Sequence, residues 1–220
     1  QVSEPREFHF PEDYGSHKDY RTEWWYFTGN NADASGRRFG YQLTFFRFSP
    51  TVKTESTRSR WRNNQFYMAH LALTDVKEKR FYAFERFSRA AVNLAGANSN
   101  GMHVWLDDWS AKAEADADFP LRIQAGEKQI AIDLNLQQGK AIVLHGDQGV
   151  SIKNAEPGNA SYYYSYTRMP TEGNISIDGR VYKVSGNSWM DREWSSSALG
   201  KDQLGWDWFA LQLSNNHELM

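Results

Sequence analysis

Short runs of aromatic and β-branched residues recur along the chain, and helical periodicity is almost absent. Such runs are typical of β-strands, whose side chains point alternately to the two faces of a sheet. Turn-forming pairs such as Asp178-Gly179 and Asn30-Asn31 lie between the runs. The pattern predicts strands over residues 23–28, 38–48, 65–74, 80–88, 102–106, 110–115, 121–125, 129–136, 141–145, 150–154, 161–167, 173–177, 180–189 and 206–213.

This number of short strands predicts an all-β sandwich or barrel with less than about a quarter of its residues in helices. A change of character near residues 154–159 is a candidate domain boundary. The sequence begins at Gln1 without a methionine and ends at Met220, in what reads as the first residues of a strand. We therefore expect it to be a fragment of a longer protein.

Composition and charge narrow the classes of function. The 220 residues include 9 Trp, 11 Tyr and 13 Phe, which is enough aromatic surface for a sizeable core. The net charge of −2 gives no reason to expect a nucleic-acid partner, and no apolar run reaches the ~18 residues of a transmembrane helix. The chain has no cysteine, no paired histidine spacing and no phosphate-binding motif, so we expect neither a metal site nor a cofactor.

The segment SWMDREWS, residues 188–195, is the most informative candidate site. In an extended segment Asp191 and Glu193 share a face with Trp189, whereas Arg192 and Trp194 lie on the other face. Carboxyl groups among tryptophans are candidates for general acid–base catalysis, because burial raises the pKa of a carboxyl group. A solvated surface pair of acidic residues is the alternative interpretation.

Four other groups carry polar or charged side chains among aromatic residues, and core packing is the alternative to ligand binding for each. A histidine or a phenol on an apolar face needs a hydrogen-bond partner, and a ligand bound in a cavity can supply one. The groups are Trp24 with Glu23 beside it, His70, the tyrosines Tyr162, Tyr164 and Tyr166 followed by Arg168, and the pair Trp206 and Trp208.

Five stretches together resemble the AttH-like/CrtC-like family. They are EWWYFTGN from residue 23, FGYQLTFFRF from residue 39, HLALTD from residue 70, SYTRMPTEGNISIDGRVYKVSGNSWMDREWS from residue 165 and GWDWFALQL from residue 205. The resemblance implies two consecutive lipocalin-like (calycin) antiparallel β-barrels. Residues 1–155 would then be the N-terminal barrel region, and residues 156–220 would complete it and start the second barrel.

The resemblance also implies candidate catalytic residues. In the carotenoid hydratase branch of the family, an aromatic-x-Asp motif supplies the acid, and Trp189-Met190-Asp191 matches this motif. That branch has Tyr at the position of Trp189, and it has His and Trp on the preceding strand, where Tyr162 and Tyr164 align. Glu193 is the second candidate catalytic carboxylate. Trp189 and Trp194 would help to bind the ligand, since aromatic faces stabilise a cation.

The sequence thus predicts a lipocalin-like protein that binds a lipophilic small molecule, a lipid or isoprenoid, in an aromatic-lined barrel pocket. One alternative is a hydratase- or cyclase-type enzyme with Asp191 as the general acid. Another is a glycan-binding or glycan-cleaving protein, because tryptophans beside carboxylates also suit sugars. The resemblance further implies a bacterial periplasmic or cell-envelope location and an ABC transporter as a partner.

These candidates lead to specific expectations about geometry. At least two of His70, Tyr164 and Asp191 should line one shared cavity. Asp191 should be buried and hydrogen-bonded, because an unpaired buried carboxyl group costs several kcal/mol. Its expected partner is Tyr164 or His70, with Arg192 on the opposite face. A neutral partner in an apolar wall would let the pKa of Asp191 rise, whereas a cation would lower it.

Overall fold

The computed structural model describes residues 2–50, 64–114, 118–196 and 203–220. These residues form strands, turns and one short 3-10 helix, η1 (Glu12–Tyr14), with no α-helix among them. The described residues also contain no helix of the length and apolar character that crossing a membrane requires. The strands are β1 (Thr22–Asp33), β2 (Arg38–Phe48), β3 (Phe66–Asp75), β4 (Arg80–Arg89), β5 (Ala95–Ala97), β6 (His103–Leu106), β7 (Trp109–Ala113), β8 (Leu121–Glu127), β9 (Ile130–Leu136), β10 (Val143–Leu144), β11 (Val150–Ile152), β12 (Ala160–Ile177), β13 (Arg180–Ser195), β14 (Leu211–Gln212) and β15 (Glu218–Leu219).

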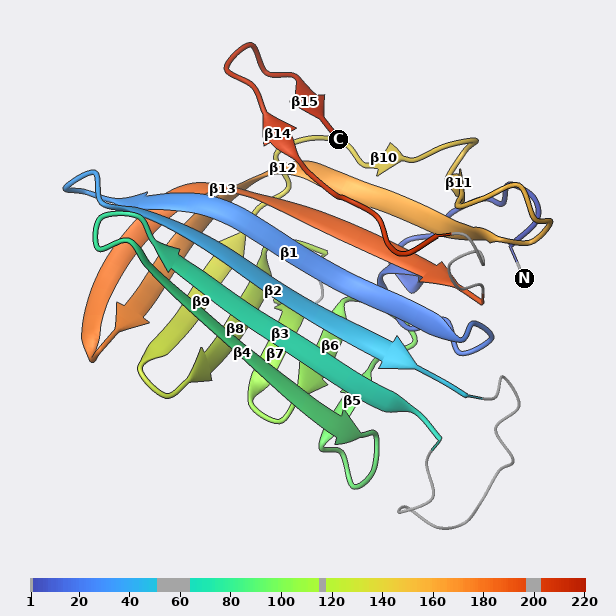
Figure 1. Cartoon of the computed structure of the whole chain (residues 1–220), viewed down its shortest axis with the longest axis horizontal. Coiled ribbons are helices and arrows are strands. Elements are labelled where there is room, and N and C mark those ends of the chain that lie inside the picture. The colour runs from blue at the N-terminus through green and yellow to red at the C-terminus, as the bar shows by residue number, and fades with distance from the viewer. Residues whose placement is uncertain (1, 51–63, 115–117, 197–202) are drawn as a thin grey trace.

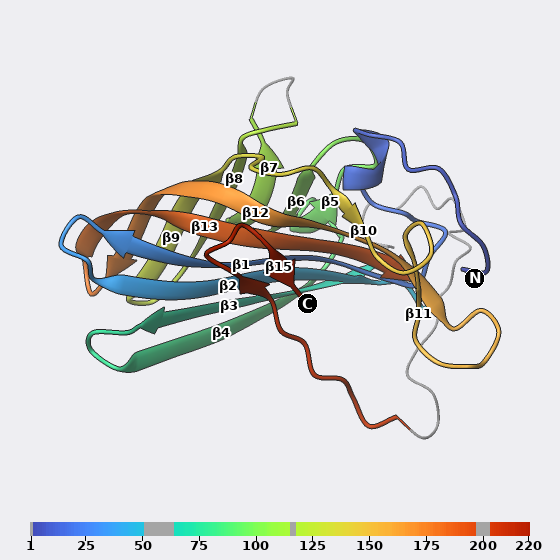
Figure 2. The ribbon, with the colours of Figure 1, turned by 90° about the horizontal axis from the view of Figure 1, so that it is seen from above.

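One antiparallel sheet, in the order β4-β3-β2-β1-β13-β12-β9-β8-β7-β6-β5, curls into a nearly closed barrel. Strands β1 to β4 form its front layer and β5 to β9 lie behind them (Figure 1), and Figure 2 shows the same ribbon from above. The short strands β10 and β11 pair with the first part of β12, whose second part pairs with β9. Arg86 of β4 reaches across the open seam to Asp108 and Glu127. The prediction of an all-β antiparallel barrel is confirmed.

The strand predictions hold in outline and differ in length. The predicted strands 161–167 and 173–177 are one continuous strand, β12, and only Leu211–Gln212 of the predicted strand 206–213 is extended in a ladder. The turn at Asp178-Gly179 is confirmed, with φ of 50° and 79°. The turn predicted at Asn30-Asn31 is wrong, because β1 continues to Asp33. Strands β12 and β13 come after the candidate boundary at residues 154–159, and they belong to the same barrel as the strands before it. The start of a second barrel in residues 203–220 stays a prediction.

The barrel interior is a packed core. Along β1, β3 and β9 every second side chain is buried, and the intervening ones are only partly covered. Large inward-facing side chains with almost no exposed surface include Trp25, Phe27, Leu43, Phe45, Leu71, Trp109, Tyr164 and Trp194. In the described part of the chain, core side chains therefore occupy the interior where the sequence placed a ligand.

A cluster of buried charges ties the N-terminal segment to one end of the barrel. The Glu23 carboxylate lies between the guanidinium groups of Arg47 on β2 and Arg192 on β13, and all three side chains are fully buried. Burial alone would raise the pKa of Glu23, but the two arginines and His17 together hold it well below its usual value. Arg47 also donates to the backbone carbonyls of His17 and Tyr20, both at 2.8 Å. The cluster thus fixes residues 17–23 against β2 and β13.

We predict that Glu23→Gln destabilises the fold by about 3–5 kcal/mol, because it leaves two buried guanidinium groups without their shared counter-charge. The free energy of unfolding in urea would measure this effect. Asp133→Asn is the matched control, since Asp133 pairs with Arg122 at a site where both side chains are about 40% exposed. That control should cost less than about 1 kcal/mol. An equal loss in the two variants would contradict the prediction.

Candidate functional site

Strand β13 places Asp191 and Arg192 on opposite faces of the sheet. Asp191 lies opposite Ser165 of β12 and opposite Tyr26 of β1, so these three side chains share the outer face of the barrel. Arg192 lies opposite Tyr164 and points into the interior. The predicted alternation across residues 189–194 is therefore confirmed, including the orientation of Arg192 away from the carboxyl group.

Asp191 is buried, and its hydrogen-bond partners among the described residues are neutral side chains. The Ser165 hydroxyl donates to Asp191 Oδ1, and Trp189 Nε1 donates to the same oxygen at 2.7 Å. The side chain is 3% exposed. Burial raises the pKa of Asp191 to about 6, against the opposing effect of these donors and of Tyr163. The prediction of a buried, hydrogen-bonded carboxyl group is confirmed, but the predicted partners, Tyr164 and His70, are wrong.

The segment 203–220 covers this part of the outer face. In Figure 1 it runs back in front of β13 before turning into β14 and β15. The indole of Trp208 packs edge-on against Tyr26, with ring centroids 4.9 Å apart, and against Trp189 at 6.4 Å. Trp208 Nε1 donates to Tyr163 Oη at 3.4 Å. The carboxyl group of Asp191 is thus enclosed by four aromatic side chains from four different segments, β1, β12, β13 and residues 203–220.

Glu193 lies two positions along the same face but in a different electrostatic setting. Its Oε1 lies 2.5 Å from Lys153 Nζ and also accepts a hydrogen bond from Ser161. Burial raises the pKa of Glu193, and the Lys153 ammonium opposes that rise. Among the described residues Asp191 has no such cation beside it. Of the two predicted catalytic carboxyl groups, Asp191 is therefore the one suited to hold and donate a proton.

Three of the predicted ligand-binding residues belong to the barrel core instead of this face. Tyr162 and Tyr164 lie inside, where their hydroxyls donate to the backbone carbonyls of Glu4 and Asp13 at 3.0 and 3.1 Å. Trp194 stacks on His17 with ring centroids 3.7 Å apart. Tyr163 and Ser165, each next to one of these tyrosines in the sequence, are the β12 residues that face Glu193 and Asp191.

The remaining predicted residues are on the outer side but do not form one cluster. His70 lies in the same cross-strand row as Asp191, separated from it by β1 and β2, or about 14 Å at the usual strand spacing. Its ring packs against Phe46 at 5.4 Å. Trp24 lies opposite Glu193. A shared cavity for two of His70, Tyr164 and Asp191 is not formed: Tyr164 faces the core, and His70 lies three strands from Asp191.

Arg168 and Trp206 also lie apart from Asp191. The ladder of β12 shifts register between Tyr166 and Met169. Arg168 therefore does not continue the face of the tyrosines, and it binds Glu218 of β15 at 2.7 Å. Trp206 is 68% exposed and does not share the packing of Trp208.

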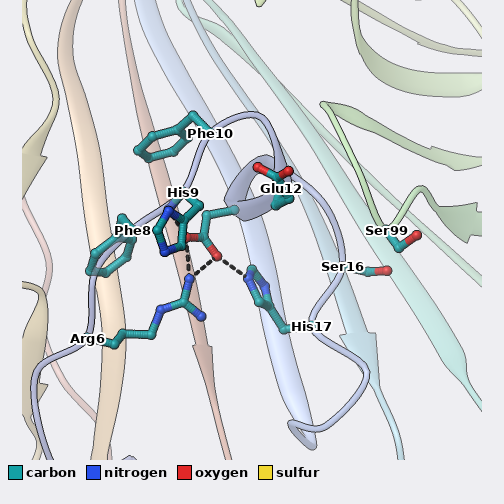
Figure 3. Close-up of a pocket in the computed structure, with 9 residues that line it drawn as sticks. Arg6, Phe8, His9, Phe10, Glu12, Ser16, His17 and Ser99 are labelled. Carbon is teal, nitrogen blue, oxygen red and sulfur yellow. Dashed lines mark hydrogen bonds and ion pairs between the residues drawn. The ribbon is translucent and has the colours of Figure 1, made fainter.

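A second candidate is an open pocket at the end of the barrel, formed mostly by the N-terminal segment (Figure 3). Arg6, Phe8, His9 and His17 are among its lining residues. Its arginine is already paired inside the pocket, since Asp13 binds both Arg6 and His17. The described residues also contain no cluster of three side chains suited to hold a metal ion. The Asp191 face therefore remains the stronger candidate.

Comparison with known proteins identifies the family. A sequence profile described as AttH-like matches residues 1–220. The chain belongs to the AttH-like family. A crystal structure assigned as AttH, from Nitrosomonas europaea, shares 32% identity with a TM-score of 0.87 and covers 99% of this chain. The AttH-like chain spans 64% of that protein's length.

A second solved structure shares the AttH-like fold at low identity. Kievitone hydratase from Nectria haematococca has a TM-score of 0.64 at 11% identity, and the alignment covers 87% of this chain and 53% of that one. No curated protein matches the sequence. The comparisons thus support the lipocalin-like barrel and the family. The reaction has to be inferred from the residues of the site.

Several residues of the AttH-like site escaped the sequence analysis. Ser165, Tyr163, His145 and Lys153 approach the two carboxyl groups only because β12, β10 and β11 pair beside β13. The alternation of side chains along β12 is a sequence signal for Tyr163 and Ser165, but it does not tell which face of the strand forms the site. Tyr162, Tyr164 and Tyr166 lie on one face and Tyr163 on the other. Trp208 was noted as one of a pair of tryptophans, without any indication of which one would pack over Asp191.

We predict that the stability of the AttH-like chain falls by about 2 kcal/mol as the pH rises from 4 to 6 because of Asp191 alone. Its pKa is about 6 in the folded state against a usual value of 3.8, so the folded state holds the proton more tightly and loses that advantage as the group ionises. Asp191→Asn should remove this part of the slope in urea unfolding measured from pH 4 to 8. Asp178→Asn, at a side chain that is 59% exposed, should leave the slope unchanged. A wild-type slope in Asp191→Asn would refute the assignment.

Proposed function

We propose that this AttH-like chain binds a lipophilic small molecule against the outer face of β12, β13 and β1 and protonates it from Asp191. One observation carries the proposal: in the described part of the chain, a buried carboxyl group receives its hydrogen bonds from neutral donors and lies among the rings of Trp189, Trp208 and Tyr26. Such a setting keeps a carboxyl group able to donate a proton near neutral pH.

The raised pKa decides how much acid is available. With a pKa of about 6, about a tenth of the Asp191 groups hold a proton at pH 7, against less than about a thousandth at the usual value. Protonation of an alkene or a similar group leaves a cation, which the faces of indole and phenol rings stabilise. The half-buried rings of Tyr26 and Trp208 border the carboxyl group on the solvent side, and the ligand would approach there.

The reaction would be of the hydratase or cyclase type, in which proton donation starts an addition or a ring closure. The fold likeness to kievitone hydratase is consistent with this class, although at 11% identity it supports the fold alone. The identity of the ligand, a cell-envelope location and a link to an ABC transporter stay predictions. Binding without turnover is the alternative, because the same aromatic side chains suit a carrier.

The burial of both carboxyl groups argues against the glycan alternative. Glycoside-cleaving enzymes place two carboxyl groups on either side of a bond in an accessible cleft. Asp191 and Glu193 are each 3% exposed and lie on the same strand face, and Glu193 is paired with Lys153. An apolar ligand that contacts the surrounding rings fits this arrangement better than a sugar chain.

We predict that Asp191→Asn abolishes turnover while binding stays close to wild type, because asparagine keeps the shape and lacks the transferable proton. A panel of lipophilic alkenes incubated in heavy water, followed by mass spectrometry, would detect product as the gain of water or of carbon-bound deuterium. Native mass spectrometry would measure binding in the same samples. Asp133→Asn serves as the surface control.

Two outcomes would change the assignment. Conversion at the wild-type rate by Asp191→Asn would reduce Asp191 to a structural hydrogen-bonding residue. Stoichiometric binding of a panel member without conversion by the wild type would favour the carrier alternative.

A further inference from the structure

A histidine and a serine form a chain of hydrogen bonds that leads away from Asp191. His145 Nε2 lies 2.7 Å from Ser165 Oγ, and Ser165 Oγ donates to Asp191 Oδ1. Ser165 is fully buried, whereas the His145 ring is half-buried. The chain therefore begins at the enclosed carboxyl group and ends at a group that reaches the surface.

Strand pairing holds this arrangement in place. His145 follows β10, which pairs with β12 through Val143 opposite Ser165. The backbone N–H of His145 donates to the Tyr163 carbonyl at 3.0 Å. Its ring packs against the Tyr163 ring with centroids 4.2 Å apart. The imidazole is thus positioned by two contacts that are independent of its bond to Ser165.

The proposed function requires a path by which Asp191 regains its proton. Each proton that Asp191 gives to a ligand leaves a carboxylate that must be protonated again before the next turnover. The Trp189 N–H is a donor only and does not act as a proton carrier. The Tyr163 hydroxyl also reaches Asp191, but its further contacts, Met220 Sδ at 3.2 Å and Trp208 Nε1 at 3.4 Å, do not lead to a group that takes up a proton from solvent. Among the described residues bonded to Asp191, Ser165 is the one whose hydroxyl both gives and accepts a proton and leads on to a titratable side chain, His145.

The charges around His145 keep it able to pass protons on. Burial and the nearby Lys153 ammonium lower the pKa of His145 to about 4, so that the ring is neutral near pH 7. A neutral imidazole carries a proton on one nitrogen and a free electron pair on the other. Nδ1 has no hydrogen-bond partner among the described residues, which leaves it for solvent. Among the described residues, the other titratable groups facing this site are Glu193, which is paired with Lys153, and Tyr163, whose pKa burial raises.

We propose that Ser165 and His145 form a proton relay that returns a proton from solvent to Asp191, an inference that rests on the proposed function. A proton from solvent bonds to His145 Nδ1, and the proton on Nε2 moves to Ser165 Oγ. The Ser165 hydroxyl proton moves at the same time to Asp191 Oδ1. The carboxylate gains one proton, the serine stays neutral, and the imidazole changes from the Nε2–H to the Nδ1–H tautomer. His145 acts through Ser165 and is therefore a positioning and relay residue.

The test measures proton exchange at Asp191 without needing a substrate. Carbon-13 NMR of the Asp191 carboxyl carbon, recorded near pH 6, gives both its pKa and the rate at which it exchanges a proton with solvent. Ser165→Ala and His145→Gln should each slow this exchange by at least about tenfold. In His145→Gln the glutamine amide still donates to Ser165, so the pKa of Asp191 should stay within about half a unit. A purely structural role would change the pKa or the fold but would not slow exchange at a constant pKa.

The chain offers a matched control for each variant. Ser161→Ala removes the equivalent serine–carboxylate bond at Glu193, on the same strand. His103→Gln removes another half-buried histidine that packs on an aromatic ring, Trp105, at 4.6 Å. Neither control should change exchange at Asp191 by more than about twofold. Circular dichroism would check that each variant keeps its β-sheet.

The outcomes separate the relay from the proposed function. Slow exchange in both relay variants supports the relay even if no panel alkene is converted, in which case the proposed function alone fails. Exchange within about twofold of wild type in both variants overturns the relay, whether or not Asp191→Asn abolishes turnover. Slow exchange in Ser165→Ala alone also overturns it as stated, because His145 would then have no part in it.

Discussion

The site depends on the two-residue repeat of β13, which keeps the Arg192 guanidinium on one side of the sheet and the Asp191 carboxyl group on the other. A guanidinium within about 4–6 Å would hold Asp191 ionised and remove its capacity as an acid. The backbone of a strand prevents that contact, since neighbouring side chains point to opposite faces. One strand thus separates a charged cluster inside the barrel from an uncharged carboxyl environment outside it.

Each of the two environments is closed by a different end of the described chain. Inside, residues of the N-terminal segment bring His17 onto Trp194 and the backbone carbonyl of Gly15 onto Arg192. Outside, the segment 203–220 brings Trp208 over Tyr26. Burial raises the pKa of a carboxyl group on both sides, and the bonded partners decide the outcome. The charge of Glu23 is compensated by two arginines and Glu23 stays ionised, whereas Asp191 receives neutral donors from the described residues and keeps its proton to higher pH.

The outer face of the barrel holds the residues around Asp191 in fixed positions. Asp191 and Ser165 lie opposite each other in the longest strand pair of the sheet, and Tyr26 lies on the next strand. Strand ladders hold such side chains more precisely than loops do. The interior, by contrast, is filled by side chains that stabilise the barrel. Stability and the candidate chemistry therefore reside on different faces of the same strands.

The sequence by itself determined the all-β class, most strand positions and the division of residues 189–194 between two faces, because each of these follows from local alternation. It also identified Asp191 from its tryptophan neighbours and from the family resemblance. The tertiary structure decided which face lies inside the barrel and which residues meet across it. Tyr162 and Tyr164 are chemically as suitable as Tyr163, and only the pairing of β12 with β13 sends them to the core. His145 lies 20 residues from Ser165 in the sequence and reaches it through strand pairing, and Trp208 lies 45 residues from Tyr163 and reaches it because the chain returns over the sheet. Local periodicity carries no information about contacts at these separations.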